Sequence, residues 1–389
     1  MRNPLSERIV EIPPSGIRKF FDIVSEMKDA ISLGVGEPDF DTPWHIREEG
    51  IYSLEKGKTF YTSNAGLNHL RVEISNYLRR RFELSYDPQR EMVVTVGGSE
   101  AIDIALRAML DPGDEVLVPQ PSFVSYVPCT ILANGVPVVI DLEEKDQFKL
   151  TKEKLLEKIT PKTKILVLPF PNNPTGAIME AHELEEIAKI VVEHDLYVLS
   201  DEIYAELTYG VKHVSIASFP GMKERTILIN GFSKAYAMTG WRLGYVAGPA
   251  VIVEQMLKIH QFAIMCAPTT SQYAAIAAVR DGDSDIESMC ESYDQRRRFV
   301  LHSFQEMGLD CFEPEGAFYA FPSIKRFGMT SDEFATRLLQ EEKVAVVPGT
   351  AFGDCGEGFL RVSYAYSLKN LKEALGRMEQ FVKRLDGKA

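Results

Sequence analysis

The stretches L-Y-V-L-S-D-E-I-Y, residues 196–204, and T-I-L-I-N-G-F-S-K, residues 226–234, decide the fold. Each contains a continuous apolar run and then turns polar. Such runs predict strands that are buried on both faces, as in a parallel sheet covered by helices. Comparable runs lie at residues 92–96, 115–119, 137–142 and 164–169, with amphipathic segments between several of them. The alternation predicts an α/β fold with a doubly wound, mostly parallel sheet.

The pattern changes after residue 285. Residues 286–307 read as one long amphipathic helix, and its R-R-R triplet, residues 296–298, is expected on the solvated face. Beyond it we expect strands at residues 316–322, 344–348 and 359–365, a helix near 331–341 and a charged final helix. We therefore predict two domains: a large α/β domain of residues 45–285, and a smaller α+β domain of residues 1–44 and 286–389.

Composition and charge limit the possible partners. The chain has 389 residues and a formal net charge of −13, which argues against a nucleic-acid surface. Its five cysteines are scattered and form no C-x-x-C motif, as suits a reducing compartment. We find no signal peptide, no apolar stretch long enough to span a bilayer and no H-E-x-x-H spacing. We expect a cytoplasmic protein with no membrane partner and no metal site.

Polar motifs follow four of the predicted strands. They are G-G-S-E (97–100), P-N-N-P-T-G (171–176), S-D-E-I-Y (200–204) and G-F-S-K (231–234). Open α/β sheets bind their ligands outside the carboxyl ends of the strands. We therefore expect these four motifs to meet at one site.

Lys234 is the first candidate catalytic residue. A single lysine is most often a solvated surface residue, but this one closely follows a buried strand, and Ser233 precedes it. A lysine amine must lose its charge or be captured as an imine to react near neutral pH. Arg242 lies close enough in the chain to lower its pKa. These features favour a lysine that forms a Schiff base with pyridoxal phosphate.

Asp201 and Tyr204 would serve the same cofactor. Asp201 ends a predicted strand, where an aspartate often caps a following helix. The functional alternative is a buried carboxylate that keeps the pyridine nitrogen protonated, so that the ring accepts electrons from the substrate α-carbon. Tyr204 comes three residues later, from where its hydroxyl could reach the phenolic oxygen of the cofactor.

Gly98, Ser99 and Glu100 open a predicted helix, and backbone N–H groups at a helix N-terminus bind phosphate. Since G-G-S is also an ordinary turn, the motif is weak alone. Ser233 and Arg242 would complete the phosphate site, because arginine forms strong, charge-assisted hydrogen bonds with phosphate oxygens.

Asn173 and Arg361 are the candidate substrate-binding residues. P-N-N-P-T-G is an ordinary turn motif, but its position after a buried strand places Asn173 at the end of the sheet. Arg361 lies inside the apolar stretch F-L-R-V-S-Y. A buried arginine needs an anion, which a structural salt bridge or a substrate carboxylate could supply.

Together these motifs resemble the fold-type I pyridoxal phosphate aminotransferases of class I/II, from I-S-L-G-V-G-E-P-D-F (31–40) to the final helix. The chain is most similar to the aromatic, alanine and aspartate aminotransferase branch. The resemblance implies that Lys234 is the Schiff-base lysine and proton shuttle, that Asp201 pairs with the pyridine nitrogen, and that Tyr204 and Asn173 hold the phenolic oxygen. It also implies that Arg361 binds the substrate α-carboxylate.

Three further roles rest on the resemblance alone. Phe123 matches the aromatic residue that stacks on the cofactor ring, and Gly36 matches the backbone that closes over the substrate. Tyr61 matches a tyrosine that reaches the phosphate in the neighbouring subunit, which implies a homodimer. Aspartate-preferring relatives often carry Lys where this chain has Ser99, so the resemblance lowers an aspartate preference without excluding it.

We predict an aminotransferase that moves the amino group of an L-amino acid to 2-oxoglutarate, with aromatic or small neutral donors favoured and aspartate possible. One alternative is a carbon–sulfur β-lyase on the same fold, although T-G-W-R-L-G (239–244) favours transamination. Another is a non-catalytic regulator that binds pyridoxal phosphate. It would need an attached DNA-binding region, for which we expect no room before residue 34.

Overall fold

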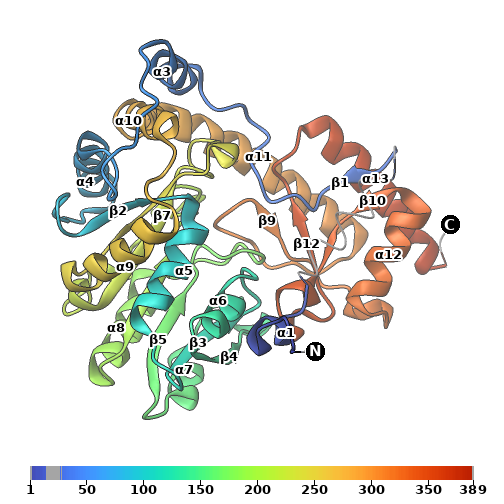
Figure 1. Cartoon of the computed structure of the whole chain (residues 1–389). Helices are drawn as coiled ribbons and strands as arrows, with labels where there is room; N and C mark the ends of the chain where they lie inside the picture. Colours follow the sequence, from blue (N-terminus) through green and yellow to red (C-terminus); the bar gives the residue numbers. More distant parts are fainter. Residues whose placement is uncertain (1, 15–26, 28, 388–389) are drawn as a thin grey trace.

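The computed structural model describes residues 2–14, 27 and 29–387. Its centre is a sheet of seven strands in the order β2-β8-β7-β6-β5-β3-β4 (Figure 1). The strands are β2 (Met92–Thr95), β3 (Glu115–Gln120), β4 (Val136–Asp141), β5 (Thr163–Leu168), β6 (Tyr197–Asp201), β7 (Thr226–Gly231) and β8 (Gly244–Ala247). The predicted α/β fold with a mostly parallel sheet is confirmed.

One strand of this sheet was not predicted. β8 runs antiparallel to both of its neighbours, β2 and β7, whereas β3 to β7 pair in parallel. β8 follows the polar T-G-W-R segment, and Gly244 and Gly248 leave it an apolar run of three residues, 245–247, which is too short to recognise.

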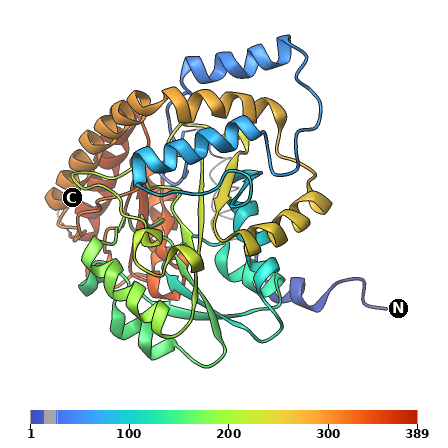
Figure 2. The same ribbon diagram turned by 90° about the vertical axis from the view of Figure 1, so that its left-hand side faces the viewer.

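Helices cover both faces of the sheet, as the continuous apolar strands require. Val167 of β5 faces a core with α5 (Gly97–Met109), α6 (Tyr126–Leu132) and α9 (Ala250–Ala263). Its neighbours Leu166 and Leu168 face the opposite core, with α8 (Ala181–Glu193) and α7 (Lys152–Lys158). Near β2 and β8, α4 (Asn68–Phe82) and α10 (Thr269–Asp281) complete that face. On the outside of α10 lies α3 (Trp44–Glu55) (Figure 2).

The C-terminal part builds its own core from α11 (Asp283–Met307), α12 (Ser331–Glu342) and α13 (Leu368–Leu385). These helices pack beside an antiparallel sheet with the order β11-β12-β9. Its strands are β9 (Tyr319–Ala320), β11 (Val347–Pro348) and β12 (Leu360–Ser363). From the N-terminal part, β1 (Ile31–Ser32) pairs with β10 (Val344–Ala345), and Leu33 joins this core.

Two expectations for the C-terminal part were wrong. Residues 344–348 do not form one strand, because β10 pairs with β1 whereas β11 pairs with β12. Nor is the arginine triplet a solvated face: the Arg296 and Arg297 side chains are 9% and 8% exposed, and only Arg298 is largely exposed. Arg296 donates to Asp39 at 2.6 Å, so it ties α11 to the N-terminal segment.

The division into two domains stays a prediction. α1 (Glu7–Glu11), assigned to the smaller domain by sequence, contacts α6 of the large one (Figure 1). Within the part of the chain that the structure describes, no helix is both long and apolar enough to cross a membrane.

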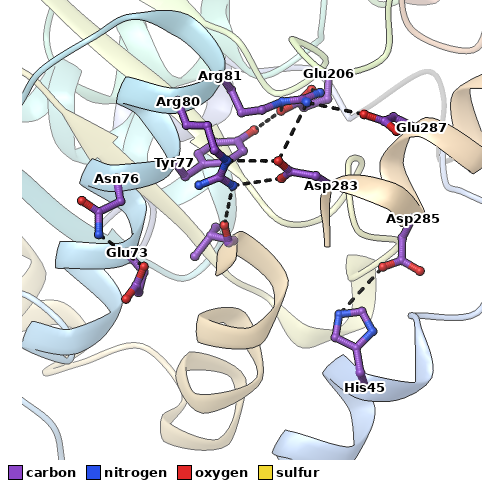
Figure 3. Close-up of polar contacts among 11 residues, drawn as sticks. His45, Glu73, Asn76, Tyr77, Arg80, Arg81, Glu206, Asp283, Asp285 and Glu287 are labelled. Carbon is purple, nitrogen blue, oxygen red and sulfur yellow. Dashed lines mark hydrogen bonds and ion pairs between the residues drawn. The ribbon is translucent and has the colours of Figure 1, made fainter. Parts of the chain in front are cut away.

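A polar cluster joins α4 to the start of α11 and to the segment after β6 (Figure 3). Glu206 is at its centre, with a side chain that is 6% exposed. It accepts hydrogen bonds from Tyr77 at 2.7 Å and from Arg81 at 3.0 and 2.7 Å. Arg80 pairs with Asp283 at 2.9 Å. Because Glu206 lies two residues after Tyr204, the cluster anchors a segment that carries a predicted site residue.

Candidate active site

A cavity of about 400 Å³ lies at the carboxyl ends of the strands, where β9 and β12 approach the large sheet. Most of the site residues predicted from the sequence line it: Gly36, Gly98, Ser99, Phe123, Asn173, Asp201, Tyr204, Ser233, Lys234, Arg242 and Arg361. Glu100 and Tyr61 are not among its lining residues. The four motifs that follow separate strands thus meet at one site.

Lys234 projects into this cavity from the segment after β7. Its Nζ donates a 2.6 Å hydrogen bond to the backbone oxygen of Gly36 and lies 5.7 Å from the ring centroid of Tyr204. Burial, followed by the charges of Arg361 and Arg242, lowers the pKa of Lys234 to about 8. About a tenth of the amine is therefore uncharged at pH 7 and about half at pH 8.

Asp201 ends β6 and a turn follows it, so the alternative of a helix cap is wrong. One of its oxygens accepts the backbone N–H of Ile203 at 3.2 Å within this turn. The other accepts the Tyr126 hydroxyl at 2.7 Å. The side chain nevertheless lines the cavity, and burial raises its pKa. A buried carboxylate with no cationic hydrogen-bond partner suits a positively charged ligand atom.

Tyr126 and Tyr319 are site residues that sequence reasoning missed. Tyr126 lines the cavity beside Phe123, with ring centroids 5.8 Å apart. Tyr319 of β9 shares a 2.8 Å hydrogen bond between its hydroxyl and that of Tyr204. Tyr126 lies in the same P-S-F-V-S-Y stretch as Phe123, so proximity in the chain was its only available signal.

The N-terminus of α5 lies at one corner of the cavity, beside Arg242. Gly97 has a φ of +74°, and a Cβ added there would lie 2.7 Å from a guanidinium nitrogen of Arg242. In the described part of the chain, Arg242 forms no salt bridge and donates only to the backbone oxygen of Thr239. With Ser99 and Ser233 also lining the cavity, free N–H groups, hydroxyls and an unpaired cation fit the phosphate of pyridoxal phosphate.

Glu100 behaves differently from its neighbours in this motif. Its carboxylate accepts the backbone N–H of Val96 at 2.5 Å and contacts the ring of His260 at 2.6 Å. The side chain is therefore directed away from the cavity, and only the backbone N–H of Glu100 remains for the predicted cofactor contact.

Arg361 is buried, 3% exposed, and has no carboxylate partner among the described residues. Its guanidinium donates to the side-chain oxygen of Asn173 at 2.8 Å and to the backbone oxygen of Gly34. The Nε atom is buried without a hydrogen-bond partner. Burial lowers the pKa of the group. Within the described residues the salt bridge of the alternative explanation is not found, so there the charge remains available to an anionic ligand.

Tyr61 lies outside the cavity and is 81% exposed. Its neighbour Phe60 is 80% exposed. Tyr61 therefore does not line the cavity of its own chain. That it reaches the phosphate in a second subunit stays a prediction.

Proteins similar to this chain are aminotransferases, in agreement with the geometry of the cavity. The aminotransferase class I and II family matches residues 28–378. The chain is 54% identical to the putative aminotransferase YugH of Bacillus subtilis (strain 168), over 98% of this chain and 99% of that protein. It is 50% identical to the aspartate aminotransferase of Pyrococcus abyssi, over 97% and 98%.

A solved structure agrees with the fold. The aromatic aminotransferase of Pyrococcus horikoshii OT3 superposes with a TM-score of 0.91 at 47% identity, over 94% of this chain and 99% of that one. On these matches, and with a cavity that fits the cofactor of the family, the chain belongs to the class I and II aminotransferases, enzymes that use pyridoxal phosphate.

Proposed function

We propose that this aminotransferase transfers the amino group of an L-amino acid to 2-oxoglutarate, with aromatic or small neutral donors preferred and aspartate possible. One observation carries the proposal. Arg361, a buried arginine with no carboxylate partner in the described part of the chain, lies in the same cavity as Lys234, a lysine whose pKa is lowered. The first group suits the α-carboxylate that all amino acids share, and the second suits proton transfer at the neighbouring carbon.

The cofactor would be held from three sides. Gly98, Ser99, Ser233 and Arg242, with the backbone of Glu100, would bind its phosphate. Asp201 would pair with the pyridine nitrogen, Phe123 would stack on the ring, and Tyr204 and Asn173 would hold the phenolic oxygen. When bound, pyridoxal phosphate supplies a sink for the electrons released at the substrate α-carbon.

The residues of the chain then divide the chemical work. Lys234 Nζ, about half uncharged at pH 8, would take up the proton that leaves the substrate α-carbon and release it again within the site. Asp201, whose carboxylate accepts a hydrogen bond from the Tyr126 hydroxyl, would pair with the pyridine nitrogen, and a positive charge there would favour the ionised carboxylate. Arg361 and the backbone of Gly36 hold the substrate, so that the proton to be moved faces Lys234.

The donor preference rests on Ser99 and on relatives. Ser99 lines the cavity and carries no charge that would attract a second carboxylate. The names of two similar proteins indicate different donors, since one is an aspartate aminotransferase and the other an aromatic aminotransferase. We favour neutral and aromatic donors because an uncharged side chain needs no cationic partner.

A homodimer is part of the proposal. Five exposed residues form what we call the apolar patch: Phe60, Tyr61, Phe262, Ile264 and Met265. Two hydrogen bonds hold its segments together, from Asn64 to the backbone oxygen of Met265 and from Thr269 to that of Phe60. Exposed apolar patches of this kind mark subunit interfaces, and Tyr61 would reach the phosphate in the partner's site.

We also propose the cytoplasm as the compartment. All five cysteines are unpaired thiols, and free thiols suit a reducing environment.

The test is the visible spectrum of the purified holoenzyme while single L-amino acids are added. Loss of the yellow absorbance, reversed by 2-oxoglutarate, is the expected result, with phenylalanine, tyrosine or alanine more effective than aspartate. Arg361→Lys should raise KM for every donor, because a lysine cannot form the two parallel bonds of a guanidinium.

Two results would reject parts of the proposal. A spectrum that persists while ammonia and a 2-oxo acid accumulate would indicate a β-lyase. An Arg361→Lys effect confined to one donor would place that residue in the side-chain pocket instead of the carboxylate site.

A further inference from the structure

Glu100 follows Ser99 in the first turn of α5, yet its side chain leaves the cavity and enters the space between α5 and α9. The carboxylate is 10% exposed and the His260 side chain is 0% exposed. A charged group at such a depth is costly unless every oxygen has a partner. Because the Glu100 side chain does not line the cavity, direct contact with a ligand does not explain why the pair is buried.

Both carboxylate oxygens of Glu100 are satisfied. One accepts the backbone N–H of Val96, the residue before α5, at 2.5 Å. The other contacts His260 Nδ1 at 2.6 Å. Because a carboxylate only accepts, Nδ1 carries the proton. The other ring nitrogen, His260 Nε2, is buried without a hydrogen-bond partner. With the proton on Nδ1, this nitrogen has only an unpaired lone pair and no buried N–H group that lacks an acceptor.

Apart from this pair, the buried Thr95 hydroxyl also holds the turn, by donating to the backbone oxygen of Gly97 at 2.9 Å. Gly97 and Gly98 have no side chains to pack, and the φ of Gly97 is +74°. Gly244 of β8 allows the turn to approach closely, since a Cβ there would lie 2.6 Å from the carbonyl carbon of Gly97 and 2.7 Å from the nitrogen of Gly98. Glycines permit this close approach but cannot fix the direction of the N–H groups.

His260 is itself anchored. It lies near the end of α9, and its backbone oxygen accepts the N–H groups of Ile264 at 2.8 Å and Met265 at 3.1 Å. The backbone oxygen of Met265 in turn accepts a hydrogen bond from Asn64 at 2.7 Å. The ring that contacts Glu100 thus belongs to a segment fixed on two sides.

We propose that the side chains of Glu100 and His260 position the phosphate site: they hold the first turn of α5 so that its backbone N–H groups point at the phosphate, and neither side chain touches the cofactor. This inference rests on the phosphate site assigned under the proposed function. It predicts that removing either side chain lowers the affinity for ligands that carry a phosphate and leaves the affinity for ligands without one nearly unchanged.

The experiment compares the dissociation constants of the apo-protein for pyridoxal phosphate and for pyridoxal, which lacks the phosphate, from visible absorbance. The variants are Glu100→Gln, His260→Leu and His260→Asn. Asp103→Asn is the matched control, because Asp103 lies on the same helix in an exposed pair with Arg107. Melting temperatures of the apo-proteins report folding.

Glu100→Gln and His260→Leu should weaken pyridoxal phosphate binding about tenfold, because a buried, charge-assisted hydrogen bond is lost. Pyridoxal binding should change less than about twofold on the same reasoning. His260→Asn should bind pyridoxal phosphate more tightly than His260→Leu does, since the asparagine amide nitrogen can donate to Glu100 from near the Nδ1 position. The control should bind both ligands as the wild type does.

Equal weakening of both ligands, or none, in variants that fold normally would overturn this inference while the proposed function stands. A wild-type apo-protein that binds pyridoxal phosphate no better than pyridoxal would overturn the phosphate site itself, and with it the assignment of Gly98, Ser99, Ser233 and Arg242.

Discussion

At the scale of single residues, Lys234 and Arg361 donate to uncharged oxygens, whereas buried cationic side chains usually pair with carboxylates. Lys234 donates to the backbone oxygen of Gly36, and Arg361 donates to an amide oxygen and a backbone oxygen. Burial is the largest cause that lowers the pKa of each. Because no carboxylate of the described residues accepts a hydrogen bond from either group, the lysine stays reactive and the arginine stays available to a ligand.

The lowered pKa of Lys234 predicts how fast the apo-protein captures its cofactor. Only the uncharged amine attacks an aldehyde, and a pKa of about 8 leaves half of the amine uncharged at that pH. The rate of appearance of visible absorbance should therefore rise with pH up to about 8 and level off above it. Stopped-flow absorbance between pH 6 and pH 10 measures this.

Two variants make the result specific. Lys234→Ala should show no such absorbance and no transamination, whereas Lys212→Ala, an exposed lysine, should behave as the wild type. A rate that still rises beyond pH 10 would mean that Lys234 titrates as an ordinary solvated lysine.

The chain order predicted residues such as Lys234 and Asp201 because each follows a recognisable strand. It could not reveal the contacts of Tyr126 and Tyr319. Tyr126 donates to Asp201, and Tyr319 shares a hydrogen bond with Tyr204. Both contacts join residues far apart in sequence, and no local pattern records which tyrosine hydroxyl meets which partner.

At the scale of elements, the polar cluster of Figure 3 ties α4 and α11 to the segment after β6. Its two arginines are adjacent in sequence but differ in surroundings. Arg81 binds Glu206, whose side chain is 6% exposed, and Arg80 binds Asp283, whose side chain is 33% exposed. The same charge should therefore contribute differently to stability at the two positions.

Arg81→Ala should lower the free energy of unfolding by about 2 kcal/mol, because Glu206 is left buried and retains only Tyr77 as a side-chain donor. Arg80→Ala should cost less than about 1 kcal/mol, as exposed ion pairs do. Urea unfolding of both variants measures the difference. Equal losses would show that burial of the carboxylate does not decide the contribution.

Element boundaries also show where sequence patterns fail. The long strands of the sheet were recognisable because both of their faces are buried and their apolar runs are continuous. β8 and the pair β10 and β11 are two to four residues long. Their pairing depends on strands distant in the chain, so the local sequence carries too little signal.

At the scale of the whole molecule, the apolar patch points to a second subunit. Phe262 and Tyr61 are 86% and 81% exposed, and water-exposed aromatic rings on one surface favour association. A dimer through this surface would bring Tyr61 of each subunit towards the site of the other.

Phe262→Asp should therefore shift the protein from dimer to monomer, because a charge cannot be buried at the interface without a partner. Analytical ultracentrifugation over a range of concentrations measures the mass. Leu156→Asp is the matched control, since Leu156 is also exposed, at 46%, but lies on α7 outside the patch. A wild type that sediments as a monomer would contradict the dimer.

The sequence by itself determined the α/β alternation and the nucleus of the site. Burial on both faces demands continuous apolar strands, and polar residues just beyond them must lie at one edge of the sheet. Only the tertiary structure decided that Arg361 donates to Asn173 and to a backbone oxygen, that Tyr126 fixes Asp201, and that the Glu100 side chain turns to His260. These facts depend on which distant segments pack together, and packing is a property of the whole chain.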